Sequence, residues 1–375
     1  MIVMHRLVTS AAVLAMALGA CSPQGTQAPP PQASRGCGSD PAPTLPPLAS
    51  AGCLAEPSPA TSPAGSASAV ETAPDGPGPI EQAVFRVPNG AHPHDVAPAS
   101  DGGIWYTGQQ NGTLGWLDPA TGEVREARLP TGAAPHGVVT GPDGAAWVTD
   151  QGLDAIIRVT PGEFNVNVFE APAGTAPHTP VFDHDGTLWF TGASGFLGRL
   201  DPADGEVQTY PTPRGAGPYG IAVTPSNDVW FVSLEKSYLG QVDKATGAVT
   251  VVEPPTANAG TRRVWSDSNG RLWISYWNAG MIAFYDPATE KWGEYDLPGQ
   301  GNQAYSMYVD ETDAVWASDF GQNSVVRFDP STETFESFPS ERANAAVRQM
   351  LGRPGEAWGA ESGADRLVVF RYGSG

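Results

Sequence analysis

Short apolar segments recur from residue 80 to the end of the chain, and each one contains a tryptophan. Runs such as "IWYTG", "LWFTG" and "VWASD" have strand-like composition and are bounded by glycine-rich and polar stretches. A constant period near 42 residues is typical of a β-propeller blade of about four strands. Seven such runs predict seven blades. Their tryptophans are Trp105, Trp147, Trp189, Trp230, Trp273, Trp316 and Trp358, at spacings of 42, 42, 41, 43, 43 and 42 residues.

Turn residues divide each repeat into four strands. Before the tryptophan stands a turn such as "SDGG", "GPDG" or "DHDG", where glycine supplies the positive φ of a hairpin. After the tryptophan, segments such as "LGWLDPATGEV" (114–124) predict a third strand, a turn and a fourth strand. The tryptophans are expected to pack between neighbouring sheets. A ligand-stacking role for them is the less favoured alternative.

The two ends of the array predict how the ring closes. "AVFRVP" (83–88) resembles an outer fourth strand but precedes the first blade, whereas the last repeat ends with its third strand in "RLVVFRYG" (366–373). The N-terminal strand is therefore expected to complete the seventh blade and to remove an exposed sheet edge. This predicts an all-β, seven-bladed β-propeller with four-stranded blades, spanning residues 80–375 as one domain.

The first twenty residues read as a targeting segment. His5 and Arg6 precede the apolar stretch 7–20, which is too short for a membrane-spanning helix and ends in "LGAC" at Cys21. This resembles a bacterial lipobox, so we expect a lipoprotein signal peptide over residues 1–20 and lipidation of Cys21. An ordinary secretory signal is the alternative. A lipid anchor would place the protein outside the cytoplasm, on the cell membrane or the outer membrane.

Composition separates a linker from the folded region. Residues 21–79 contain fourteen prolines and no aromatic residue, so they are expected to form a disordered tether. Cys37 and Cys53 lie in this segment and could form a disulfide or remain two thiols. The net charge of -20 argues against nucleic acid or an anionic membrane surface as an electrostatic partner. It is compatible with a neutral or cationic ligand, although acidity also keeps an exported protein soluble.

Residues that differ between blades at equivalent positions are the candidates for function. One register lies eleven residues before each tryptophan and should open the innermost strand at the mouth of the central channel. A second register lies three residues after the tryptophan, in the loop on the same rim. The first register contains His94, His136, His178, Tyr219, Arg262, Tyr305 and Val347, with Arg348 beside the last. The second contains Gly108, Asp150, Gly192, Ser233, Tyr276, Asp319 and Glu361.

The folded region has five histidines, and three of them occupy the first register in consecutive blades. The "Pro-His" pair could be inherited repeat sequence with the imidazole capping a backbone group, or the histidines could form a functional cluster. Neutral imidazoles bind metals and act as general bases near neutral pH. Asp150 could orient His136 from across the hairpin. Side chains expected to bind a ligand at the channel mouth are His178, Tyr219, Arg262, Tyr276, Tyr305, Asp319, Arg348 and Glu361.

The blade pattern resembles the virginiamycin B lyase (streptogramin B lyase) family of seven-bladed propellers. The resemblance covers residues 80–375 and rests on the "PHG" opening, the "DG.(L/A)W(F/V)T" strand and the continuation in "PHTPVFDHDGTLWFTGASGFLGRLDPADGEVQTYPTP" (177–213). It implies ring opening of a cyclic depsipeptide by elimination, with Mg2+. The family's site uses histidines at the first register of two adjacent blades, a glutamate two residues before the second histidine, and a glutamate three residues after the next tryptophan.

Blades one and two fit that site best. The resemblance implies that His94 matches the first histidine, as a metal or carbonyl contact, and that His136 matches the second, as general base or acid. Asp150 takes the place of the second glutamate, while Ala134 stands where the first glutamate belongs. Losing a carboxylate should weaken an oxygen-lined Mg2+ site. His92, Asp319 or Glu361 could compensate.

Three hypotheses of function follow. The leading one is a monomeric, lipid-anchored carbon–oxygen lyase that opens a cyclic depsipeptide or another lactone or ester. Antibiotic resistance is one role for such an activity, beside cell-wall or secondary metabolism. The second is a non-catalytic surface propeller that binds a small molecule or a protein at the histidine-bearing rim, which Ala134 favours. The third is a lactone hydrolase, which differs from a lyase by adding water to its product.

Overall fold

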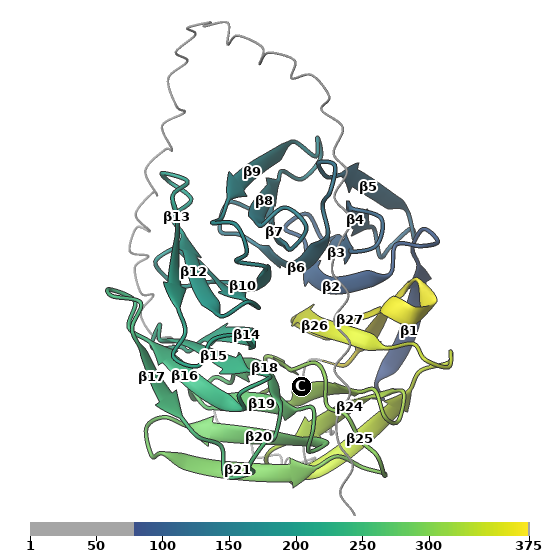
Figure 1. Cartoon of the computed structure of the whole chain (residues 1–375). Helices are drawn as coiled ribbons and strands as arrows, with labels where there is room; N and C mark the ends of the chain where they lie inside the picture. Colours follow the sequence, from purple (N-terminus) through teal and green to yellow (C-terminus); the bar gives the residue numbers. More distant parts are fainter. Residues whose placement is uncertain (1–78, 374–375) are drawn as a thin grey trace, which may run out of the picture. The chain divides into compact units, whose positions relative to one another are not determined.

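The computed structural model describes residues 79–373, and these form seven four-stranded antiparallel sheets arranged as blades around a ring (Figure 1). The predicted all-β seven-bladed propeller is confirmed. The signal peptide, Cys21, Cys37, Cys53 and all but the last residue of the linker lie outside the described residues. Within residues 79–373 the only helical element is the short 3-10 turn η1 (Ser362–Ala364), so no helix there is long and apolar enough to cross a membrane.

Blades one to six each use four consecutive strands, innermost first. Blade one has β2 (Pro93–Pro98), β3 (Ile104–Gly108), β4 (Thr113–Leu117) and β5 (Val124–Arg128); blade two has β6 (Pro135–Thr140), β7 (Ala146–Asp150), β8 (Ala155–Val159) and β9 (Val166–Glu170); blade three has β10 (Pro177–Phe182), β11 (Leu188–Gly192), β12 (Phe196–Leu200) and β13 (Val207–Pro211). Blade four has β14 (Pro218–Val223), β15 (Val229–Ser233), β16 (Tyr238–Val242) and β17 (Val249–Val252); blade five has β18 (Thr261–Ser266), β19 (Leu272–Tyr276), β20 (Met281–Asp286) and β21 (Lys291–Asp296); blade six has β22 (Tyr308–Val309), β23 (Val315–Asp319), β24 (Ser324–Asp329) and β25 (Thr334–Pro339).

The seventh blade closes the ring as the sequence predicts. Its strands β26 (Val347–Arg353), β27 (Glu356–Glu361) and β28 (Arg366–Arg371) come from the C-terminal end, and β1 (Glu81–Arg86) supplies the outer strand. β1 pairs antiparallel with β28 from Glu81 opposite Arg371 to Arg86 opposite Arg366. The pairing satisfies the backbone groups of β28 that would otherwise form an exposed edge. Both ends of the described chain are thereby held in one sheet.

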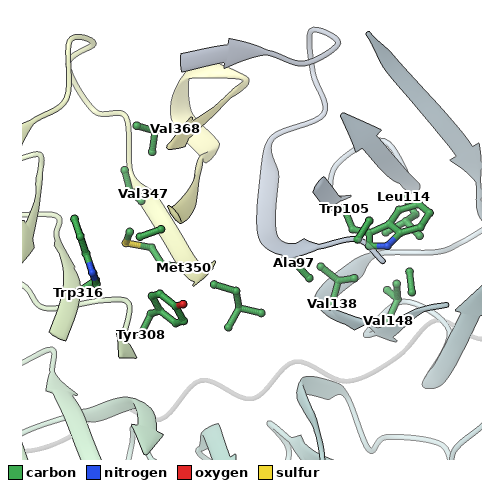
Figure 2. Packing of buried hydrophobic residues seen from close by; sticks show 14 of the residues in the cluster. Ala97, Trp105, Leu114, Val138, Val148, Tyr308, Trp316, Val347, Met350 and Val368 are labelled. Atoms are coloured by element: carbon green, nitrogen blue, oxygen red, sulfur yellow. The ribbon is translucent and has the colours of Figure 1, made fainter. Parts of the chain in front are cut away.

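The marker tryptophans are structural, as predicted. All seven are buried, and several donate the indole N–H to a carboxylate in the turn that precedes the strand, such as Trp147 to Asp143 and Trp316 to Asp310. A buried indole needs such an acceptor because an unpaired buried donor is costly. Figure 2 shows the apolar packing between blades, with Met350 and Tyr308 on one side and Ala97 and Val138 on the other.

A break in the innermost strand of most blades positions the mouth of the channel. In β2, Pro93 pairs with Gly108 and Val96 pairs with Tyr106, so His94 and Asp95 are left out of the regular ladder. β6, β10, β14 and β18 have the same irregularity. Such bulges redirect side chains at the rim of a sheet. The first-register residues of these five blades therefore leave the regular ladder and gather at the channel mouth.

Candidate functional site: the channel mouth

Each of the seven blades delivers one side chain to a continuous ring at the mouth, six from the innermost strand and Tyr305 from the segment before β22. Blade seven contributes Arg348 rather than Val347. In blade one Trp105 pairs with Ala97, three residues after His94; in blade seven Trp358 pairs with Leu351, which is three residues after Arg348. The ring runs through His94, His136, His178, Tyr219, Arg262, Tyr305 and Arg348.

Three histidines form a stacked row on one side of the ring. Ring centroids are 3.8 Å apart between His94 and His136, between His136 and His178, and between His178 and Tyr219. The three imidazoles are only 2–3% exposed. Burial, aided by the neighbouring arginines, lowers the pKa of His94, His136 and His178 well below 6.5. The row is therefore neutral at pH 7.

Hydrogen-bond partners assign the tautomers of two of these rings. His136 Nδ1 lies 3.1 Å from the carbonyl oxygen of His178, which can only accept, so Nδ1 carries the proton and Nε2 keeps a free lone pair. His94 Nδ1 lies 2.7 Å from Asp95 Oδ1, while Arg348 Nη1 donates to His94 Nε2 at 3.2 Å. His136 is thus the better proton acceptor, because the lone pair of His94 is already occupied.

Arginine and tyrosine form the other side of the ring. Tyr305 is buried, and its hydroxyl lies 3.1 Å from that of Tyr219 and accepts from Arg348 Nη1 at 3.2 Å. The Arg262 guanidinium lies 3.9 Å from the Tyr305 ring centroid. Although burial alone would raise it, the guanidinium groups of Arg262, Arg263 and Arg348 lower the pKa of Tyr305 to about 8. The phenol is therefore a protonated but acidic donor at pH 7.

A buried ion pair closes the channel immediately beneath the ring. Arg263 Nη2 donates to Asp95 Oδ1 at 3.3 Å, and Arg263 Nη1 donates to Thr179 Oγ1 at 2.8 Å. Burial raises the pKa of Asp95, opposed by Arg263. A cavity of about 30 Å³ adjoins Asp95 and Arg263 and is otherwise lined mainly by apolar residues such as Val138 and Ile221. It has room for about one water.

The mouth is locally positive, in contrast to the acidic chain as a whole. Arg262, Arg263 and Arg348 face the single carboxylate of Asp95, and the histidines add no charge. The sequence-based expectation of a neutral or cationic ligand rested on the net charge of -20, which does not describe this surface. Local potential is set by the charges nearest the site.

A set of hydroxyl side chains that positions the ring was not anticipated from the sequence. The residue two places after several marker tryptophans donates to the carbonyl of the next blade's ring residue, as Thr107 does to His136 at 2.7 Å and Thr149 does to His178 at 2.6 Å. The same hydroxyls accept a backbone N–H of their own blade. The signal was present as Thr or Ser in the motifs "WYT", "WVT", "WFT", "WIS" and "WAS".

Second-register residues belong to the scaffold, which corrects the expectation that they face a ligand. Asp150 is fully buried, and its Oδ1 accepts from the backbone N–H groups of Ala134 and Leu153 at 3.0 and 2.9 Å. Its hydrogen bonds do not include His136, which is instead oriented by the His178 carbonyl. Burial raises the pKa of Asp150.

Asp319, Glu361 and Tyr276 are also held by the scaffold, the first two by hydrogen bonds and the third by packing. Asp319 Oδ1 accepts from the N–H of Gln303 at 2.8 Å, and Glu361 Oε2 accepts from Arg366 Nε at 2.6 Å. Tyr276 packs in the apolar core between blades four and five, where burial and the nearby Glu294 raise its pKa. These three residues shape the loops around the mouth but their hydrogen bonds do not reach the ring.

The donors at the mouth do not fit Mg2+. Within residues 79–373, His94, Asp95 and His136 are the one group of histidine, cysteine and acidic side chains close enough to hold an ion. Its only carboxylate is that of Asp95, whose Oδ1 already accepts from His94 and Arg263, and Arg348 occupies His94 Nε2. Mg2+ requires several oxygen ligands, and guanidinium groups repel it. Ala134 supplies no carboxylate, and the His92 imidazole is hydrogen-bonded through Nδ1 to the carbonyl oxygen of Ser362 at 3.1 Å.

The fold and the ring together define a seven-bladed propeller with a histidine, tyrosine and arginine site at one mouth of its channel. The chain belongs to the virginiamycin B lyase family, whose sequence profile matches residues 77–328. Virginiamycin B lyase from Staphylococcus aureus superposes with a TM-score of 0.73 at 19% identity, over 78% of this chain and 99% of that one.

Further solved structures share the fold. A catalytically inactive variant of the Staphylococcus aureus enzyme with quinupristin matches at 20% identity and a TM-score of 0.73, over 78% of this chain and 99% of that one. YCF48 bound to D1 peptide matches at 16% identity and a TM-score of 0.62, over 78% of this chain and 97% of that one. No curated protein matches the sequence. At these identities the likeness to solved structures establishes the fold alone.

Proposed function

We propose that the protein is a lyase that opens a lactone or ester by elimination at the channel mouth, without a metal ion. The observation that carries the proposal is the free Nε2 of His136 in a buried, neutral imidazole row, beside the hydrogen-bond donors of Arg348 and Tyr305. Family membership supports the reaction type.

The elimination requires a base and a stabilised oxyanion. His136 Nε2 takes the proton from a carbon that lies between a second carbonyl group of the substrate and the carbon bearing the ester oxygen, and the C–H electron pair forms the new double bond between these two carbons. The carbon–oxygen bond of the ester breaks, and its electron pair leaves as a carboxylate. Arg348 and the Tyr305 hydroxyl donate to the carbonyl oxygen on which negative charge develops. No water is consumed, so a lactone and its ring-opened product have the same mass, and an open-chain ester gives two products whose masses sum to that of the substrate.

In this proposal guanidinium groups, rather than a metal ion, stabilise the negative charge that develops on the enolate oxygen. A histidine is a weak base toward a carbon-bound proton, so the enolate needs strong stabilisation. A preorganised donor to a developing oxyanion contributes about 3 to 4 kcal/mol. Arg348 is fixed by its bonds to His94 and Tyr305, and this fixed geometry spares reorganisation during the reaction.

The test incubates the full chain with quinupristin and with simpler lactones and esters, and determines product mass. A ring-opened product of unchanged mass is expected, and a chelator should not reduce its formation. His136→Gln should lower kcat about 100-fold or more, whereas His184→Gln, on the exposed surface, should not. A product heavier by one water would identify a hydrolase, and strict dependence on Mg2+ would overturn the metal-free route.

The second candidate is a non-catalytic propeller that binds its ligand at the same mouth. Ala134 in place of the family glutamate and the occupied lone pair of His94 favour it, and YCF48 offers the example of a similar propeller with a bound peptide. His136→Gln separates the two. Lost turnover with unchanged affinity supports the enzyme, whereas lost affinity without turnover in either form supports the binder.

We also propose that lipidation of Cys21 anchors the protein outside the cytoplasm. The motif "LGAC" and the proline-rich segment 21–79 support this arrangement, because together they supply an attachment point and a tether. Cys21→Ser should move the protein from the membrane fraction to the soluble fraction of cells. Unchanged membrane association, or absence of lipid on the wild-type chain by mass spectrometry, would contradict the anchor.

A further inference from the structure

Arg262, one of the two arginines of the ring, is surrounded by aromatic side chains and has no direct role in the proposed elimination. The Arg262 guanidinium lies 4.5 Å from the Trp277 ring, 4.5 Å from the Tyr219 ring and 3.9 Å from the Tyr305 ring. Arg262, Trp277 and Tyr219 are all partly exposed at the mouth. Aromatic faces orient a guanidinium and leave its N–H edge available.

The charge of Arg262 is not neutralised by any carboxylate among residues 79–373. Its Nη2 donates to the Tyr219 hydroxyl at 2.6 Å, and its Nε is buried without a partner. The nearest carboxylate of the site, Asp95, is paired with Arg263. A guanidinium has five N–H donors, so Arg262 keeps most of its donors for a ligand.

Aromatic surface continues beyond Arg262. Phe320 stacks on Tyr305 with centroids 4.6 Å apart and packs edge-on against Trp277 at 5.5 Å. Phe320 and Trp277 come from the loops after β23 and β19 and are partly exposed. A ligand whose anionic group meets Arg262 would therefore lay its apolar part against these rings.

We propose that Arg262 and Trp277 form a subsite for a carboxylate attached to an aromatic or other apolar group. The planar guanidinium edge matches the two oxygens of a carboxylate, and the partly exposed rings match the attached group. The proposal rests on the proposed function for its place beside the reacting centre and restricts the substrates to those that carry such a carboxylate. Binding at the subsite itself requires no turnover.

The test compares two probes on the full chain by calorimetry, N-acetylphenylalanine and its neutral amide. The carboxylate should bind about tenfold or more tightly than the amide, and salt should reduce the difference. Arg262→Gln should remove the preference, and Arg262→Lys, which keeps charge but loses the planar fork, should retain part of it. Trp277→Leu should weaken both probes alike.

A matched control is Arg214, an exposed arginine 5.0 Å from the Tyr238 ring whose charge is paired with Glu253. Arg214→Gln should leave both affinities unchanged. Equal binding of the two probes, a preference that survives Arg262→Gln in a protein of wild-type melting temperature, or inorganic phosphate bound as tightly as the carboxylate would each overturn the subsite.

The outcomes also separate this proposal from the lyase. Turnover of neutral lactones by the wild-type chain, with no carboxylate preference in binding, would refute the subsite and leave the elimination standing. Carboxylate-selective binding without turnover of any lactone or ester would refute the elimination and leave the subsite standing.

Discussion

The stacked histidine row makes stability depend on pH in a way that can be calculated. His94, His136 and His178 have pKa values well below 6.5 in the folded protein because burial disfavours the charged imidazole. In the unfolded chain each has a pKa of about 6.5. The unfolded state therefore binds more protons below that value, and the free energy of unfolding falls as the pH falls.

The magnitude follows from linkage. A histidine that stays neutral when folded costs about 1.4 kcal/mol for each pH unit below its unfolded pKa. Between pH 7.5 and pH 5.5 a histidine that stays neutral when folded therefore contributes a loss of about 1 kcal/mol, and a row of three contributes a loss on the order of a few kcal/mol. The contribution of the neutral row to the free energy of unfolding is present above the unfolded pKa of about 6.5 and is lost as the pH falls below it. A loss of this size is a large part of the net stability of a domain.

Urea unfolding at a series of pH values measures this dependence. Replacing His136 by Gln should reduce the loss between pH 7.5 and pH 5.5 by about 1 kcal/mol, whereas His184→Gln, at an exposed site, serves as the matched control. A free energy of unfolding that is flat over this range, or imidazole resonances of the folded protein that titrate near pH 6.5, would refute the assignment of a neutral row.

Three further predictions test the scaffold and the tyrosine. Thr149→Val removes the hydroxyl that donates to the His178 carbonyl and accepts from the Gly137 N–H. The free energy of unfolding in urea should fall by about 1 to 3 kcal/mol. An unchanged unfolding midpoint would contradict the role of this hydroxyl in joining the two blades. A chain shortened to begin at residue 87 lacks β1 and should self-associate through the uncovered edge of β28, which size-exclusion chromatography would detect. A chain that begins at residue 79 keeps β1 and should remain a monomer. If both shortened chains are monomers, closure of the ring by β1 is refuted. Since Tyr305 has a pKa of about 8, tyrosinate absorbance should appear as the pH rises through 8 and be missing in Tyr305→Phe; the same signal in both proteins would assign it elsewhere.

The sequence predicted the fold because each repeat carries complete local information. The same order of strands is predicted by the tryptophan period, by the Asp-Gly turns and by the strand-like runs. Seven copies of this order are compatible with few architectures other than a propeller. Ring closure was also predictable, since "AVFRVP" lacks a blade before it and the last blade lacks a fourth strand. Repetition likewise identified the first register, because His94, His136 and His178 stand out only when the blades are aligned.

Tertiary structure decided what those residues can do. The sequence suggested that Asp150 orients His136 from across their hairpin. In the folded protein the Asp150 carboxylate instead accepts hydrogen bonds from the backbone N–H groups of Ala134 and Leu153. It also could not show that the hairpin between β26 and β27 is one residue shorter than its counterpart in blade one and so brings Arg348 to the ring, because the pairing of Leu351 with Trp358 depends on the folded sheet.

Electrostatic charge shows most clearly the difference between what the sequence determines and what the tertiary structure determines. The composition determines a net charge of -20, a global sum that carries no positions. Only the closed ring brings Arg262, Arg263 and Arg348 from blades five and seven around Tyr305 and the neutral histidines. Electrostatic interaction falls with distance and is strongest where water is excluded, so the chemistry of the mouth depends on contacts between residues as far apart in sequence as His94 and Arg348.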